Sequence, residues 1–264
     1  MVKQIDLKAL KQESRETVQN AQVSPKGMIA LYMGLVLVMD LASVFSGDVQ
    51  FLSTFLSILT TLLANVLNAG FILYCMAIRR GERTEYLMLF DGFSFVGRII
   101  ILSLLIQCLT SMWAMLFIIP GIVAHYRYRF ALLNLYENPE LGILNAMNLS
   151  SRQTYGYKRQ LLMMDISYLG WSILASFPNL IYNGILLSES FRLTSDYMKN
   201  PGGLLPVIDP SVLILPDWAW ILISGLWALA VALIYLPQRR CTEVGFFEIA
   251  RAHPADLSTP SLPE

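Results

Sequence analysis

The sequence is poor in the residues that build most metal, redox and disulfide sites. It has only two histidines, His125 and His253, and three scattered cysteines. Two distant histidines cannot supply a multi-histidine metal site, and three separated cysteines indicate neither a disulfide framework nor a cysteine-based metal site. A glycine-rich phosphate loop is also missing, because Gly202 and Gly203 lie among prolines and indicate a turn. We therefore expect no metal and no cofactor.

Charged residues are scarce as well, at 14% of the chain, and the 19 Lys and Arg residues balance the 19 Asp and Glu residues. This balance gives no electrostatic support to a nucleic-acid partner. Apolar residues make up 55% of the chain, and the mean hydropathy is +0.54. Both values lie above the usual range of soluble proteins. The composition therefore predicts an all-α integral membrane protein whose partner is the lipid bilayer.

Five apolar runs approach or exceed the length of about 20 residues that crosses a bilayer as a helix. A sixth run is shorter and contains Arg127 and Arg129, but it begins at a Pro-Gly turn and ends before Asn138-Pro139. The predicted fold is a polytopic six-helix transmembrane bundle over residues 28–236, between a cytoplasmic amphipathic segment, 1–27, and a cytoplasmic tail, 237–264. The predicted spans are 28–45, 51–78, 99–119, 121–136, 161–187 and 218–236.

The distribution of positive charge supports the sixth span, because Lys and Arg in short loops stay on the cytoplasmic side. Six spans place 15 of the 19 Lys and Arg residues inside, with Arg192 and Lys199 outside and Arg127 and Arg129 within the membrane. If 121–136 were an extramembrane loop, 11 would lie inside and 8 outside. Six spans with both termini in the cytoplasm are therefore favoured.

Polar links between the spans also carry helical patterns. Asn138 and Pro139 suit the N-cap and first position of a helix. Leu141, Leu144 and Met147 then recur at three-residue spacing, which indicates an interfacial cytoplasmic helix between the fourth and fifth spans. A similar polar helix is expected over 6–19. The outer link, 188–217, is rich in proline yet apolar, so we expect it to pack over the helix ends, with a lid over a cavity as the alternative.

Five ionisable residues lie inside the predicted spans, where each charged group costs about 2.5 to 3.5 kcal/mol. They are Asp40, His125, Arg127, Arg129 and Asp165. Matching their depths at about 1.5 Å per helical residue pairs Asp40 with Arg127 and Asp165 with Arg129. Such pairs either link helices structurally or line a hydrated pocket that binds a lipid head group or passes a small solute.

Four ordered motifs carry a family resemblance. They are Trp113-Ala114-Met115-Leu116-Phe117-Ile118-Ile119-Pro120-Gly121-Ile122, Glu137-Asn138-Pro139-Glu140-Leu141, Gly156-Tyr157-Lys158 and Asp165-Ile166-Ser167-Tyr168-Leu169-Gly170-Trp171. Together they resemble the bacterial integral membrane family known as domain of unknown function 975, and more distantly the membrane domain that accompanies some glycerophosphodiester phosphodiesterases. The chain departs from the family pattern at Thr154 and in its basic run, 125–129.

The resemblance implies a multi-pass protein of the bacterial cytoplasmic membrane with no established activity. It also implies structural roles for nine motif positions: Pro120, Gly121, Asn138, Pro139, Gly156, Lys158, Ser167, Gly170 and Trp171.

We expect no enzymatic activity. Ser167 and Asp165 lie two residues apart on one predicted helix and so face different ways, and no histidine lies near them in the sequence. The amphipathic inner segments and the absence of repeat symmetry in the sequence favour a scaffold or accessory subunit of the cell envelope that contacts lipids or other membrane proteins. The alternative is a small permease or channel-like protein with a charged intramembrane pocket. A hydrated cavity beside Arg127 and Arg129 favours the permease, and dry, fully paired arginines favour the scaffold. The sequence does not predict the oligomeric state.

Overall fold

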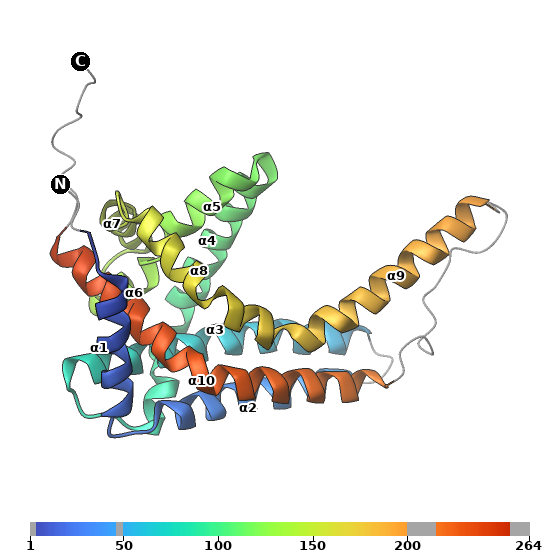
Figure 1. The fold of residues 1–264 in the computed structure, drawn as a ribbon, viewed down its shortest axis with the longest axis horizontal. Helices are drawn as coiled ribbons and strands as arrows, with labels where there is room; N and C mark the ends of the chain where they lie inside the picture. The colour runs from blue at the N-terminus through green and yellow to red at the C-terminus, as the bar shows by residue number, and fades with distance from the viewer. Residues whose placement is uncertain (1–3, 46–49, 200–214, 254–264) are drawn as a thin grey trace, which may run out of the picture.

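The computed structural model describes residues 4–45, 50–199 and 215–253, and every regular element in these ranges is helical (Figure 1). The elements are α1 (Leu7–Gln19), α2 (Pro25–Val44), α3 (Gln50–Arg80), the 3-10 helix η1 (Tyr86–Phe95), α4 (Val96–Leu116), α5 (Ile118–Arg127), α6 (Ala131–Glu137), α7 (Ile143–Gln153), α8 (Lys158–Ala175), α9 (Phe177–Lys199) and α10 (Asp217–Ala252). The all-α prediction is confirmed.

Four of these helical segments are long and apolar enough to cross a membrane: α2, α3, α4 together with η1, and α10. The pair α8 and α9 counts as a fifth if it forms one span bent by 65°. These segments overlap five of the six predicted spans. The fifth predicted span, 161–187, is the bent pair, and its second helix continues to Lys199, so the first part of the predicted outer link is helical.

The fourth predicted span, 121–136, is not one continuous helix. It falls on the short helices α5 and α6, which are separated at Tyr128–Phe130. The break is stabilised from outside, because the backbone N–H of Phe130 donates to Ser150 Oγ at 3.1 Å and the carbonyl of Arg127 accepts from the same hydroxyl at 2.9 Å. A side chain of α7 thus satisfies backbone groups that an unbroken helix would pair internally.

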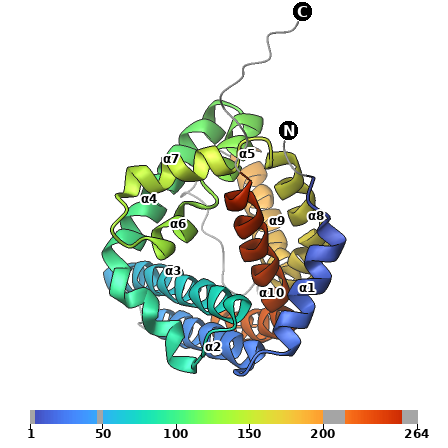
Figure 2. The ribbon, with the colours of Figure 1, turned by 90° about the vertical axis from the view of Figure 1, so that its left-hand side faces the viewer.

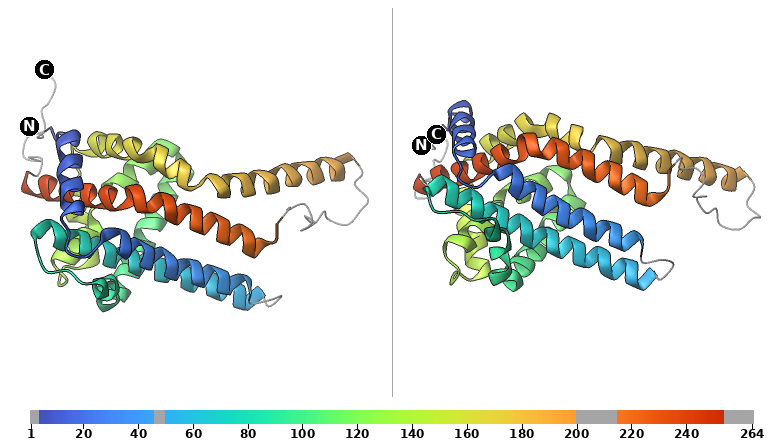
Figure 3. Two further views of the ribbon diagram at one scale, coloured as in Figure 1. Left: turned by 60° about the horizontal axis from the view of Figure 1, so that its bottom comes forward. Right: turned by 90° about the horizontal axis from the view of Figure 1, so that it is seen from below.

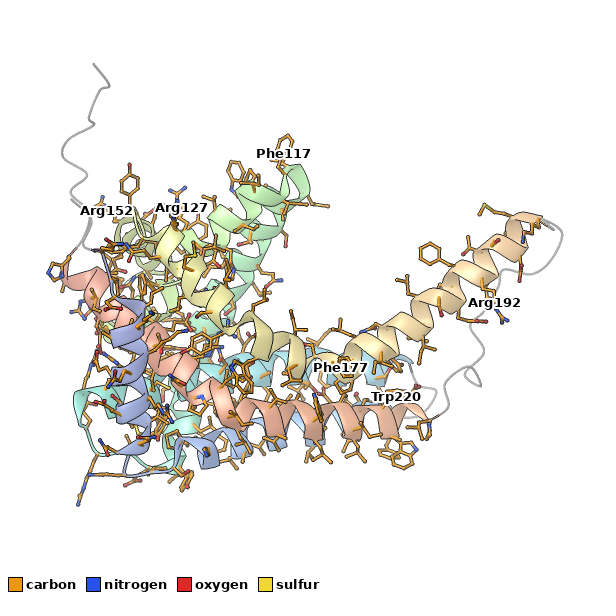
Figure 4. All side chains as sticks on the ribbon, in the orientation of Figure 1. Phe117, Arg127, Arg152, Phe177, Arg192 and Trp220 are labelled. Carbon is orange, nitrogen blue, oxygen red and sulfur yellow. The ribbon has the colours of Figure 1, made fainter. Side chains whose placement is uncertain are left out.

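A tight hairpin joins α4 to α5. Phe117 is its single extended residue, at φ −158° and ψ 144°, and it lies at the tip (Figure 4). A Cβ at Gly121 would come within 2.8 Å of Ala114 Cα, so only glycine allows this close approach of the two helices. Pro120 lies in the first turn of α5, where its missing N–H removes one donor that would have no intrahelical partner.

The helices form an extended part and a packed part. α2, α3 and the first half of α10 run side by side (Figure 3), whereas α1, α6, α7 and the end of α10 gather at one end of the molecule (Figure 2). The largest buried aromatic side chains lie mainly in the packed part: Tyr74, Tyr157, Phe71, Phe130, Phe246 and Phe247. Because α1 begins and α10 ends there, the described chain starts and finishes at the same end.

The predicted N-terminal helix is present as α1. Asp6 is its N-cap and accepts hydrogen bonds from the backbone N–H groups of Lys8 and Ala9. α1 packs across α10, where Gln238 donates to the Lys11 carbonyl at 3.1 Å. The ammonium of Lys11 donates to Ser167 Oγ at 2.6 Å, and partial burial lowers the pKa of Lys11. These contacts hold α1 against the middle of α8 and of α10.

The predicted helix before the fifth span begins later than expected. Asn138 is not an N-cap but the C-cap of α6, where its N–H donates to the Asn134 carbonyl. α7 starts only at Ile143, after Gly142. Its position at a membrane interface stays a prediction. Half of the predicted outer link, 200–214, and the tail from 254 onward lie outside the described residues, so the lid stays a prediction.

Candidate functional site

A cluster of five charged residues lies where α5, α8 and α10 meet. Arg129 follows α5 and donates two hydrogen bonds to Asp165, at 2.5 and 3.0 Å. Its Nε donates to Glu243 Oε1 at 2.8 Å. The side chains of Arg129 and Glu243 are 7% and 9% exposed, so these are buried ion pairs rather than surface contacts. We expect such pairs to fix the three helices relative to one another.

Two neighbouring arginines of α10 complete the cluster. Arg240 donates to Glu243 Oε2 at 2.8 Å and to Asn68 Oδ1 on α3 at 2.9 Å. Arg239 lies 3.5 Å from Asp165 Oδ1. The cluster therefore holds three arginines and two carboxylates, which leaves one positive charge in excess.

A cavity of about 670 Å³ opens beside this cluster. One wall is a polar stripe on α4, formed by Ser103, Gln107 and Thr110, whose spacing of four and three residues places them on one face of the helix. Asn65 and Asn68 of α3 also line the cavity. The serine, threonine and glutamine side chains of α4 are thus concentrated around this cavity, whereas the only polar side chains that α3 contributes are its two asparagines.

A second cavity, of about 540 Å³, lies between α2, α8, α9 and α10. Its polar lining includes Asp40, Ser43, Asn179 and Ser224. Asn68 and Arg240 line both cavities, so the hydrogen bond between them lies at the boundary between the two.

The structure places the five sequence-predicted charges in three different settings. Arg129 and Asp165 form the expected ion pair, and His125 lines the same 670 Å³ cavity. Asp40 lines the other cavity. Arg127 does not pair with Asp40, because its Nε donates to Ser151 Oγ at 2.8 Å.

The expected pairing of Asp40 with Arg127 is therefore wrong, for a physical reason. Depth matching assumed that 121–136 is a straight span and that Arg127 lies in its outer half. Instead the chain bends directly after α5. Arg127 lies beside α7, near Arg152 and away from α2 (Figure 4).

The family-motif positions act mainly in turns and helix contacts. Gly156 has a φ of +79°, a left-handed conformation that favours glycine, in the turn before α8. Lys158 is the first residue of α8. Trp171 stacks on Tyr235 of α10, with ring centroids 6.1 Å apart. Gly170 has open space around it, and nothing in the structure requires glycine there.

Sequence reasoning missed three members of the cluster: Arg239, Arg240 and Glu243. The last apolar run ends at 236 and Pro237 follows it, which predicts that these residues belong to the cytoplasmic tail. α10 continues through Pro237 to Ala252 and changes direction part-way along its length (Figure 1). The three-residue spacing of Arg240 and Glu243 is the signal that could have shown a continuing helix.

Comparison with known families decides where the chain belongs. The family model described as protein of unknown function (DUF975) matches residues 115–251, slightly more than half of the chain. The chain is a member of this family. The matched part of this DUF975 protein runs from the α4–α5 hairpin nearly to the end of α10, so it includes all five charges of the cluster. No curated protein and no solved structure matches the chain.

The similarity to the phosphodiesterase-associated membrane domain stays a prediction. In the described part of the chain, no three His, Cys, Asp or Glu side chains lie together as a metal ion would require.

Proposed function

We propose that this DUF975 protein is an integral protein of the bacterial cytoplasmic membrane, of the small-permease class, that binds a polar solute in the 670 Å³ cavity without catalysing a reaction. One observation carries the proposal: the apolar helix α4 directs its serine, threonine and glutamine side chains to a cavity that ends at a charged cluster, and Asn65 and Asn68 of α3 line the same cavity. Polar groups inside a membrane mark solute pathways more often than they serve lipid contact.

Membrane insertion is supported by the apolar surface. Met115, Ile118 and Ile119 at the α4–α5 hairpin are 90%, 78% and 75% exposed, and α4 exposes Leu104 and Met112 as well. Contiguous apolar surface of this kind is rare on soluble proteins. We therefore place the hairpin in lipid.

The six-span topology belongs to the same proposal, with both termini cytoplasmic. α2 and α3, α4 and α5, and the α8–α9 pair with α10 each lead away from the packed end and back to it (Figure 1). This even number of passes keeps both ends on one side even though α5 is short. A reporter fused after Glu264 should be active in the cytoplasm and inactive as an external reporter; the opposite pattern would contradict the topology.

A thiol-accessibility experiment tests for a hydrated cavity. Gln107 lines the cavity, whereas the next residue, Cys108, is exposed on another face of α4, and the two other cysteines, Cys75 and Cys241, are buried. In membranes, a water-soluble, membrane-impermeant thiol reagent should label the Gln107→Cys, Cys108→Ala double variant at least about tenfold faster than it labels Cys108 in the wild type, because thiolates form in water and not in lipid.

Cys108 of the wild type is the control, because it is adjacent to position 107 on α4 but does not line the cavity. Equally slow labelling of the double variant and the wild type would indicate a dry cavity and contradict the permease. Fast labelling of wild-type Cys108 would contradict the membrane position of α4.

A scaffold or accessory subunit is the second candidate, and a different observation favours it. Arg79 bridges Glu13 of α1, at 2.9 Å, and Glu248 of α10, at 3.0 Å. Glu137 accepts from both Arg80 and Arg251. These ion pairs tie the helix ends into one surface that could receive lipid head groups or other membrane proteins. Slow labelling at position 107, which indicates a dry cavity, would favour the scaffold function.

A further inference from the structure

The arginines of the charged cluster differ in how fully they are paired. Arg129 uses its donors on Asp165 and Glu243, and Arg240 uses its two terminal nitrogens on Glu243 and Asn68. Arg239 has one contact with a carboxylate, at 3.5 Å, which is too long for a hydrogen bond. The excess positive charge of the cluster therefore resides mainly on Arg239.

The carboxylates of the described cluster are already shared with other donors. Asp165 already accepts two hydrogen bonds from Arg129 and a third from the Tyr126 hydroxyl, at 2.9 Å. Glu243 accepts from Arg129 and Arg240. A guanidinium that is only 25% exposed and lacks a full counter-charge is costly at a membrane-embedded site. An anion bound in the cavity would supply that counter-charge.

The lining of the cavity indicates the class of anion. Arg239 lines the 670 Å³ cavity, a volume typical of small-molecule sites. A planar guanidinium matches the oxygens of a phosphate group in two-point contacts, and the side chains of Asn65 and Gln107 offer further N–H donors. The apolar lining, from Leu102, Ile106 and Leu132, suits a ligand with an apolar portion but does not require one.

We propose that the cavity binds a phosphate-type oxyanion through Arg239, either as a free phosphate or as the head group of an anionic lipid. This inference rests on the proposed function, since it assigns the solute class to the same cavity. Arg129 and Arg240 keep a structural role, and Arg239 is the ligand-binding cation.

Ligand binding to the purified full-length protein in a neutral maltoside detergent tests this assignment. The probes are inorganic phosphate, phosphatidylglycerol and, as a lipid without net charge, phosphatidylcholine. Thermal stability and calorimetric titration should detect binding of phosphate or phosphatidylglycerol but not of phosphatidylcholine. The Arg239→Gln variant should bind at least about tenfold more weakly, Arg239→Lys should retain part of the affinity, and Arg83→Gln, at an exposed site outside both cavities, should bind like the wild type.

The outcomes distinguish a free anion from a lipid head group and test whether Arg239 binds the ligand. Saturable binding of inorganic phosphate indicates a free anion, and binding of phosphatidylglycerol alone indicates a lipid head group. The assignment is overturned if the wild type binds neither probe, or if Arg239→Gln binds as well as the wild type. If Arg239→Gln does not fold, unchanged affinity in Arg239→Lys with loss in Arg129→Lys would overturn it. Fast labelling of the cysteine at position 107 without any anion binding would contradict this inference but would still support the proposed function.

Discussion

Replacing Arg129 by leucine should lower the free energy of unfolding by about 3 kcal/mol, because the partly buried Asp165 loses both hydrogen bonds to Arg129 and the buried Glu243 loses one of its two arginine partners. The change is measured by detergent-induced unfolding in mixed micelles. Arg83→Leu, at an exposed position, serves as the control and should change stability by less than about 0.5 kcal/mol.

A neutral residue at position 165 should partly rescue the Arg129→Leu variant. Adding Asp165→Asn removes the carboxylate that loses both hydrogen bonds to Arg129, whereas Glu243 keeps Arg240 as its partner, so part of the lost stability should return. A charge swap between Arg129 and Asp165 is a poorer test, because an aspartate at 129 would face Glu243. A loss below about 1 kcal/mol in Arg129→Leu would show that the cluster is not a structural link.

A methyl group at Gly70 should destabilise the protein by about 3 kcal/mol, near the upper end of the range for overpacked cores. Its Cβ would lie 2.0 Å from the backbone oxygen of Leu89 in η1, so the backbones of α3 and η1 would have to separate. Gly34→Ala on α2 is the matched control, because its Cβ would meet nothing within 4 Å, and we expect a gain of about 0.5 to 1 kcal/mol.

Both glycine variants can be compared by unfolding in the same micelles and by the yield of monodisperse protein. If Gly70→Ala were as stable as Gly34→Ala, the close contact of α3 with η1 would be incorrect.

The long helices could be predicted from the sequence because hydropathy over about 20 residues depends on composition alone. The start of α1 was also predictable, since Asp6 is a local N-cap signal. The break between α5 and α6 was not. It depends on Ser150, which lies 20 residues further along the chain and satisfies the backbone of Phe130. Local patterns contain no information about such a partner.

The charged cluster was predictable only in part, for a related reason. Arg129 and Asp165 were visible as ionisable residues inside apolar runs, and they do form an ion pair. Glu243 was not visible, because Pro237 usually ends a helix in water. Neighbouring groups can replace the hydrogen bond that a proline removes inside a packed or membrane-spanning helix, so α10 continues past it.

The contribution of α10 to the cluster determines when its ion pairs can form during synthesis of the chain. α10 leaves the ribosome after the other described helices, yet it supplies Glu243 to Arg129 and Glu248 to Arg79. Until α10 is present, Arg129 and Arg79 lack these partners, and α2 lacks one of the two long helices that pack along it. The charged cluster therefore forms only once α10 has been made, and chains that terminate before α10 leave Arg129 and Arg79 without these carboxylates.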